Sequence, residues 1–285
     1  MSYNVGRVFR EMRKSRGYTL KQVSEDIVST SCLSKFEKGE TDISLRSFLS
    51  MADRLNMDIG EIIFKSRESS SDFTIFLNEI SDFYIQQNAK RLKEIRLEQL
   101  ALFEATKSPY YKLNTLILLS FLQDLDPNMP VEEADKEYIA SALLNINTWS
   151  NYEIYLFGNT LNLLTFHTIE LICKEISKLV SAQQASSALQ KDIVNLFLNV
   201  IVIFINGDDN ARAKNLIDIV KQYLGPYYFF EKTRIMFLEG VAEYKSGGEN
   251  GLQLIEDSLT VMQILDPTTR KNHEVFLERL HIPIP

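Results

Sequence analysis

A short hydrophilic stretch around residue 30 carries side chains that could hydrogen-bond to an external partner. A helix beginning near residue 30 would place Leu33 and Phe36 on one face and hydroxyl, thiol and ammonium groups on the other. The side chains of that hydrophilic face are Thr30, Ser31, Cys32, Ser34 and Lys35. Such groups reach base edges or phosphates when a helix lies against nucleic acid, and Lys35 is the best placed of them. Thr30 and Ser31 could instead cap their own helix, and Cys32 could be a small exposed side chain or an oxidisable thiol.

Basic side chains surround this stretch. The candidates for phosphate contacts are Arg10, Lys14, Arg16, Lys21 and Lys38. Residues 1–65 hold 11 Lys/Arg and 9 Asp/Glu, whereas the rest of the chain holds 20 against 29, within a formal net charge of -7. A mildly basic start on an acidic body is typical of a phosphate-contacting module joined to a second domain, although a solvated helix face would carry the same charges.

The residue types needed for catalysis or metal binding are sparse. The three histidines are scattered, no HExxH, G-x-S-x-G or phosphate-binding glycine loop is present, and Cys32 and Cys173 lie far apart without zinc-ligand spacing. We therefore expect no enzyme activity, no metal and no cofactor. Two unpaired thiols and the absence of a signal peptide or an apolar run of transmembrane length predict a cytoplasmic protein with no membrane segment.

The elements that position these groups are predicted to be helices throughout. Five short helices fit the first 64 residues, with Thr19, Ser29 or Ser31, and Ser44 as N-caps and Gly39 as a C-terminal stop. The polar stretch KSRESSSD then marks a boundary. The predicted domains are 1–65, a linker over 66–72, and 73–285. Helical periodicity in the last domain predicts helices over 72–88, 90–106, 109–125, 131–146, 151–165, 167–182, 188–206, 210–224, 227–246, 249–265 and 270–280.

Residues 19–39, TLKQVSEDIVSTSCLSKFEKG, resemble the helix-turn-helix of the lambda-repressor-like (Xre) class. Ser24 is the small residue needed where the two helices cross, and Arg13 and Glu37 match the positions of an internal ion pair in that class. Two departures are a Leu at position 20, where the class often has Gln, and a turn that lacks Gly and is one residue short.

A narrower resemblance covers essentially the whole chain. The pattern S-x-S-x-L-S-K-F-E-K-G-E followed by D-I-S, residues 29–44, and WSNYEIYLFGN, residues 149–159, are similar to the Rgg (Rgg/GadR/MutR) regulators of Gram-positive bacteria. The resemblance implies an all-α fold, a helix-turn-helix domain followed by tetratricopeptide-like helical repeats. It also implies a homodimer that binds double-stranded DNA, and repeats that bind a short hydrophobic signalling peptide. Peptide binding would alter the spacing of the DNA-binding domains or their contacts with RNA polymerase.

A peptide-binding face needs hydrogen-bonding groups among apolar residues. Asn195 and Asn199, one turn apart on an apolar helix, meet this need, and Asn159 and Asn162 form a second, weaker pair. Tyr228 could face a cleft and Arg234 could pair with a peptide carboxylate. Each asparagine could instead bond to neighbouring helices, and Arg234 to a structural carboxylate.

Two other functions fit the same sequence. One is a helical scaffold or antitoxin-like interaction protein that uses the first domain for protein contacts. The other is a DNA-binding regulator that senses a metabolite or no ligand. Salt-dependent DNA binding would separate the first from a regulator, because a scaffold would show none.

Overall fold

The computed structural model describes residues 4–66, 72–182 and 185–285, and every regular element in these ranges is a helix. The chain divides into two compact units, Met1–Asp82 and Phe83–Pro285. The prediction of an all-α fold is confirmed. The division lies inside helix α6 (Asp72–Ile85). Residues 67–71 of the expected 66–72 linker lie outside the described residues, so the boundary proposed from sequence stays a prediction.

Ahead of α6, the described residues of the first unit form five short helices with the caps that the sequence favours. They are α1 (Val5–Ser15), α2 (Leu20–Ser24), α3 (Thr30–Lys38), α4 (Leu45–Arg54) and α5 (Ile59–Ser66). Thr19 and Gln22 form a capping box at α2, and Ser44 caps α4 by accepting a hydrogen bond from the Ser47 amide. The side chains of Phe9, Leu33 and Met51 are fully buried between these helices. Apolar residues at helical spacing thus build one small core around α3.

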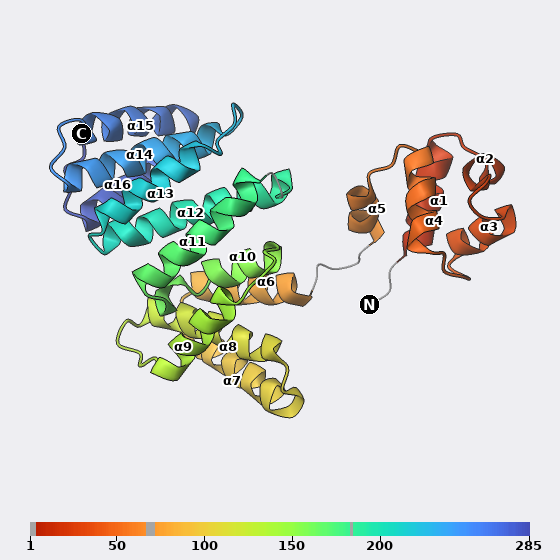
Figure 1. The fold of residues 1–285 in the computed structure, drawn as a ribbon, viewed down its shortest axis with the longest axis horizontal. Helices are drawn as coiled ribbons and strands as arrows, with labels where there is room; N and C mark the ends of the chain where they lie inside the picture. Colours follow the sequence, from red (N-terminus) through yellow and green to blue (C-terminus); the bar gives the residue numbers. More distant parts are fainter. Residues whose placement is uncertain (1–3, 67–71, 183–184) are drawn as a thin grey trace. The chain divides into compact units, whose positions relative to one another are not determined.

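The second unit is a succession of longer helices (Figure 1). They are α7 (Ala89–Thr106), α8 (Pro109–Leu125), α9 (Glu133–Leu144), α10 (Asn151–Gly158), the short 3-10 turn η1 (Leu161–Leu163), α11 (Phe166–Ser181), α12 (Ser187–Asn206), α13 (Asn210–Lys221), α14 (Phe229–Lys245), α15 (Gly251–Leu265) and α16 (Pro267–Arg279). Neighbours in sequence pack as pairs, most extensively α7 with α8, α12 with α13 and α14 with α15, and α12 also packs on α10 and α14. Paired helices stacked in chain order are the arrangement expected of helical repeats.

The pair α14 and α15 meets at two glycines. A Cβ at Gly240 would lie 2.8 Å from the carbonyl oxygen of Gly251 and 2.9 Å from Cβ of Leu254. A Cβ at Gly251 would lie 2.5 Å from the backbone nitrogen of Tyr244. All three distances are shorter than those that real Cβ atoms show, so the close packing of these helices requires glycine at both positions.

One predicted helix is wrong. The sequence predicted a single helix over 151–165, but α10 ends at Gly158, and the short η1 turn follows before α11 begins. Asn159 and Thr160 explain the break, because their side chains donate to the carbonyl oxygens of Tyr155 and Leu156 within the last turn. These hydrogen bonds offer the backbone an alternative to a further helical turn.

Helix α12 also departs from an expectation. The sequence suggested no apolar run long enough to cross a membrane, but α12 spans 20 residues and passes that test by length and composition. Half of its most apolar window is buried within the protein, and the side chains of Ile193, Phe197 and Ile201 are fully covered. Burial on this scale is that of a core helix.

Candidate nucleic-acid interface and ligand-binding faces

Helix α3 is held firmly at both ends. Ser29 caps it by accepting a hydrogen bond from the Cys32 amide at 3.1 Å, which decides between Ser29 and Ser31 as the cap. Gly39 ends the helix in the left-handed conformation, with φ at 75°, where glycine carries no Cβ penalty. Leu33 and Phe36 anchor the inner face in the core. The opposite flank of α3 therefore has a fixed orientation relative to the rest of its unit.

The structure places the five candidate base-reading residues on that outer flank. Thr30, Ser31 and Lys35 are exposed, and Cys32 and Ser34 are half-buried. Thr30 is partly engaged, because its hydroxyl lies 3.3 Å from the Ser24 hydroxyl of α2. Cys32 is a free thiol. Within the described residues, Ser31, Ser34 and Lys35 make no side-chain hydrogen bond, so their polar groups are available to a partner.

The candidate phosphate-contacting residues are exposed as well. Lys38 is the one with an acidic neighbour, Glu40, at 3.8 Å. The remaining four, which have no ion-pair partner in the described part of the chain, are Arg10, Lys14, Arg16 and Lys21. Exposed cations without acidic partners are what contact with a phosphate backbone requires.

A buried ion pair fixes α3 against α1. Arg13 Nε donates to Glu37 Oε1 at 2.6 Å and Arg13 Nη2 donates to Oε2 at 2.7 Å, with both side chains almost wholly buried. Arg13 Nη1 donates further to the carbonyl oxygen of Tyr18 at 2.6 Å. These are the two residues that the Xre resemblance singles out. Their geometry is the planar two-bond match of a guanidinium with a carboxylate, and both groups face inward rather than toward a partner.

The sequence did not reveal a second interaction that stabilises the helix-turn-helix. Arg54 of α4 donates through Nη1 to the carbonyl oxygens of Val23 at 3.1 Å and Glu25 at 2.5 Å. It thus satisfies carbonyls that the short helix α2 leaves without partners at its C-terminus. The turn that follows lacks glycine, and Asp26 adopts a left-handed conformation instead, with φ at 59°. Because Asp26 is not glycine, the sequence carried no signal that predicted this left-handed turn.

The asparagines proposed for a peptide face differ in their surroundings. On α12, Asn195 is half-buried and Asn199 is exposed, and neither amide has a hydrogen-bond partner among the described residues. Asn159, in contrast, donates its side-chain amide to the carbonyl oxygen of Tyr155 at 2.7 Å, and Asn162 is exposed within η1. The alternative that Asn195 and Asn199 hydrogen-bond to neighbouring helices thus has no support among the described residues.

Arg234 has an unusual environment for a cation. It is half-buried on α14, its guanidinium lies 5.9 Å from the centre of the Phe230 ring, and it forms no ion pair within the described residues. Burial lowers the pKa of Arg234, while Glu231 on the same helix acts in the opposite direction. Tyr228, half-buried, precedes the first turn of the same helix. Arg234 is thus a partly buried cation on which the Glu231 carboxylate acts without forming an ion pair.

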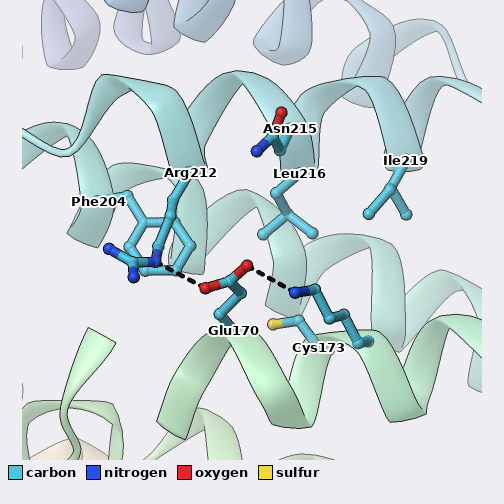
Figure 2. Close-up of a pocket in the computed structure, with 8 residues that line it drawn as sticks. Glu170, Cys173, Phe204, Arg212, Asn215, Leu216 and Ile219 are labelled. Atoms are coloured by element: carbon cyan, nitrogen blue, oxygen red, sulfur yellow. Dashed lines mark hydrogen bonds and ion pairs between the residues drawn. The ribbon is translucent and has the colours of Figure 1, made fainter. Parts of the chain in front are cut away.

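A cavity of about 210 Å³ that the sequence did not predict lies between α11 and α13 (Figure 2). Its walls include Cys173 of α11, Phe204 of α12, and Leu216 and Ile219 of α13. Glu170, Lys174 and Arg212 also line it, and the Glu170 carboxylate accepts hydrogen bonds from both cations. None of the asparagines proposed for the peptide face lines this cavity. One or two apolar residues from each of three helices give no motif, so sequence spacing could not have revealed the cavity.

Metal chemistry has no support in the described residues, where no group of three or more His, Cys, Asp or Glu side chains could hold an ion. The two thiols are unpaired, and Cys173 is buried.

Comparison with known proteins gives two family matches. Residues 75–273 match the family model for the C-terminal domain of the HTH-type transcriptional regulator Rgg. Residues 9–62 match a helix-turn-helix family model.

Solved structures share the fold. The SHP pheromone receptor Rgg2 of Streptococcus dysgalactiae superposes with a TM-score of 0.79 at 20% identity, over 96% of this chain and 99% of that chain. The PrgX/cCF10 complex superposes with a TM-score of 0.71 at 16% identity, over 99% of this chain and 95% of that chain. At these identities the likeness establishes the architecture.

Proposed function

The chain belongs to the Rgg family of HTH-type transcriptional regulators, and we propose that it binds double-stranded DNA through α3 as a homodimer, under the control of a short hydrophobic peptide. Rgg proteins are transcriptional regulators rather than enzymes. The DNA-binding proposal rests on the outer flank of α3, where Ser31 and Lys35 are exposed. It is supported by the four exposed candidate cations of the same unit that have no acidic partner in the described part of the chain. A helix of this kind fits the major groove, where polar side chains reach base edges.

Two identical DNA-binding units would read a roughly palindromic operator, and the dimer would place them at a defined spacing. In this proposal the peptide shifts the population between dimer arrangements, which alters that spacing or the contacts with RNA polymerase. A cytoplasmic location follows from the function of an intracellular regulator. An exposed flank of α3 would serve a scaffold equally well, so the salt dependence of DNA binding is the measurement that separates the two functions.

DNA binding is tested with the segment upstream of the protein's own gene, by fluorescence anisotropy over a series of salt concentrations. We expect Lys35→Ala to weaken binding by about 1–3 kcal/mol, because a base or phosphate contact is lost. Arg16→Ala should weaken binding to all sequences and flatten the dependence on salt. Lys65→Ala is the matched control, since this exposed lysine pairs with Glu61 on α5. DNA affinity that is independent of salt, or equal in all variants, would rule out the proposed interface.

The peptide proposal rests on Asn195 and Asn199. Two amides one helical turn apart can hold a peptide backbone with paired donors and acceptors, while apolar surroundings take its side chains. The pheromone receptors among the solved structures share this fold. Arg234, partly buried and without an ion pair among the described residues, would bind a peptide carboxylate.

Calorimetry with hydrophobic peptides of about eight residues, encoded beside the gene, tests this proposal. Replacing Asn195 and Asn199 together with alanine should weaken binding at least about tenfold, because two hydrogen-bonding groups are lost. Asn128→Ala is the control, since this exposed asparagine lies in the turn before α9. If the double variant binds as the unaltered protein does, the peptide lies elsewhere. DNA binding without any peptide response would favour the regulator that senses a metabolite or no ligand.

A further inference from the structure

The cavity between α11 and α13 has an apolar interior. Figure 2 shows the side chains of Cys173, Leu216 and Ile219 directed into the space between the two helices, with the Phe204 ring beside them. Burial raises the pKa of the Cys173 thiol far above its ordinary value, so the group is a neutral thiol at physiological pH. Apolar surface of a ligand that is buried against these side chains leaves water, which favours binding.

The charged groups beside the cavity neutralise one another. Glu170 Oε1 accepts from Lys174 Nζ at 2.7 Å, and Glu170 Oε2 accepts from Arg212 Nε at 2.8 Å. Hydrogen bonds from Lys174 and Arg212 lower the pKa of Glu170 to about 2, so the carboxylate stays ionised at neutral pH. Arg212 is also paired with Asp209, the N-cap of α13. Two cations thus face two anions, and no net charge remains to attract an ion.

An uncharged polar group is also available. Asn215 lines the cavity from α13, is exposed, and has no hydrogen-bond partner among the described residues. An amide can both donate and accept, so it suits a hydroxyl or an amide of a ligand. A charged ligand, in contrast, would lose hydration without a free counter-charge to replace it.

The volume sets the size of the occupant. A dry apolar cavity of about 150 Å³ holds a molecule as large as benzene. The 210 Å³ available here is somewhat larger. It would suit a molecule of about six to eight heavy atoms, well below the size of a peptide.

We infer that this cavity is a second ligand site, which binds a small, uncharged, apolar molecule carrying one hydroxyl or amide group. The site is separate from the α3 flank and from the asparagines of the proposed peptide face, and the inference does not rest on the proposed function. Phe204 belongs to the same helix, α12, as Asn195 and Asn199. An occupant would therefore contact the helix that presents the proposed peptide-binding amides.

The test uses three molecules of one length, n-hexanol, hexanoate and hexylammonium, with the full chain and saturation-transfer NMR. We expect hexanol to bind and both charged molecules to bind at least about tenfold more weakly, because the ion pairs leave neither charge a partner. Ile219→Trp should fill the cavity and abolish hexanol binding. Asp218→Trp, at an exposed neighbouring position of α13 that does not line the cavity, should leave hexanol binding unchanged.

A charge variant provides a second, independent test. Glu170→Gln removes one anion beside the cavity and leaves Lys174 without its carboxylate, so hexanoate should gain about tenfold in affinity relative to hexanol. The inference is overturned if the three molecules bind equally well, if hexanol binds the Ile219→Trp protein undiminished, or if Glu170→Gln leaves the preference unchanged. Circular dichroism on each variant establishes that it is folded.

Discussion

Replacing Glu37 with alanine is expected to destabilise the N-terminal unit by about 3–5 kcal/mol, because the substitution leaves the Arg13 guanidinium buried without its counter-charge. The side chains of this pair are 6% and 3% exposed, so water cannot replace the lost carboxylate. The Tyr18 carbonyl oxygen satisfies only one of the guanidinium's donors. A loss of this size is a large part of the free energy of unfolding expected for a unit as small as Met1–Asp82. The helix-turn-helix should therefore lose its DNA affinity along with its fold.

Hydrogen exchange of the backbone amides in α1 and α3 measures the stability of the first unit separately from that of the second. Fluorescence of the single tryptophan, Trp149, would report on the second unit instead. Glu61→Ala is the matched control, because Glu61 pairs with Lys65 on α5 with both side chains about half exposed. It should cost no more than about 1 kcal/mol. The double variant Arg13→Met with Glu37→Leu should regain most of the lost stability, since it removes both charges. Equal protection in the Glu37 and Glu61 variants would show that the pair does not hold α1 to α3.

Replacing Phe237 with alanine is expected to destabilise the C-terminal end of the second unit by about 3–5 kcal/mol. The ring is fully buried on α14 and contacts two rings of α16, His273 edge-on with a centroid distance of 4.8 Å and Phe276 at 6.2 Å. Its removal would leave a cavity between the two helices and admit water to the imidazole. Urea unfolding followed by circular dichroism, together with hydrogen exchange of α14 to α16, measures the loss.

The histidine gives a second readout of the same variant. Burial lowers the pKa of His273, and the charge of Arg234 lowers it further, whereas a backbone hydrogen bond to Thr269 raises it. Opening the site should therefore move the pKa of His273 up toward its ordinary value, which an NMR titration follows. Phe229→Ala is the control on the same helix, because that ring is 69% exposed and its loss should cost less than about 0.5 kcal/mol. If both variants lose the same stability, the contact between α14 and α16 is not what holds this end together.

The short-range signals of the first unit were sufficient to predict its helices. Thr19 and Ser44 cap helices as their type and position indicated, and Gly39 ends α3 in the left-handed conformation. Caps and stops act over three or four residues, so they can be read without knowledge of the fold. The resemblance to the Xre class supplied the long-range partner of Arg13, which spacing alone would not have identified.

Features that depend on tertiary contacts could not be predicted. Asp26 adopts a left-handed turn without a glycine, and Arg54 reaches across to carbonyls some 30 residues away in sequence. Helix α10 ends early because Asn159 and Thr160 bond back to its last turn, although the apolar pattern continues. The cavity between α11 and α13 arises from the spacing of two helices, and no single stretch of sequence encodes that spacing.

The contact at Gly240 and Gly251 limits how the last helical pair can vary. Each position faces backbone atoms of the other helix or the other glycine, and backbone atoms cannot rotate aside as a side chain can. Randomised libraries aimed at a new ligand specificity should therefore leave these two codons untouched. The varied positions should instead be solvent-facing ones such as Asn199 and Phe229, where a larger side chain does not force the helices apart.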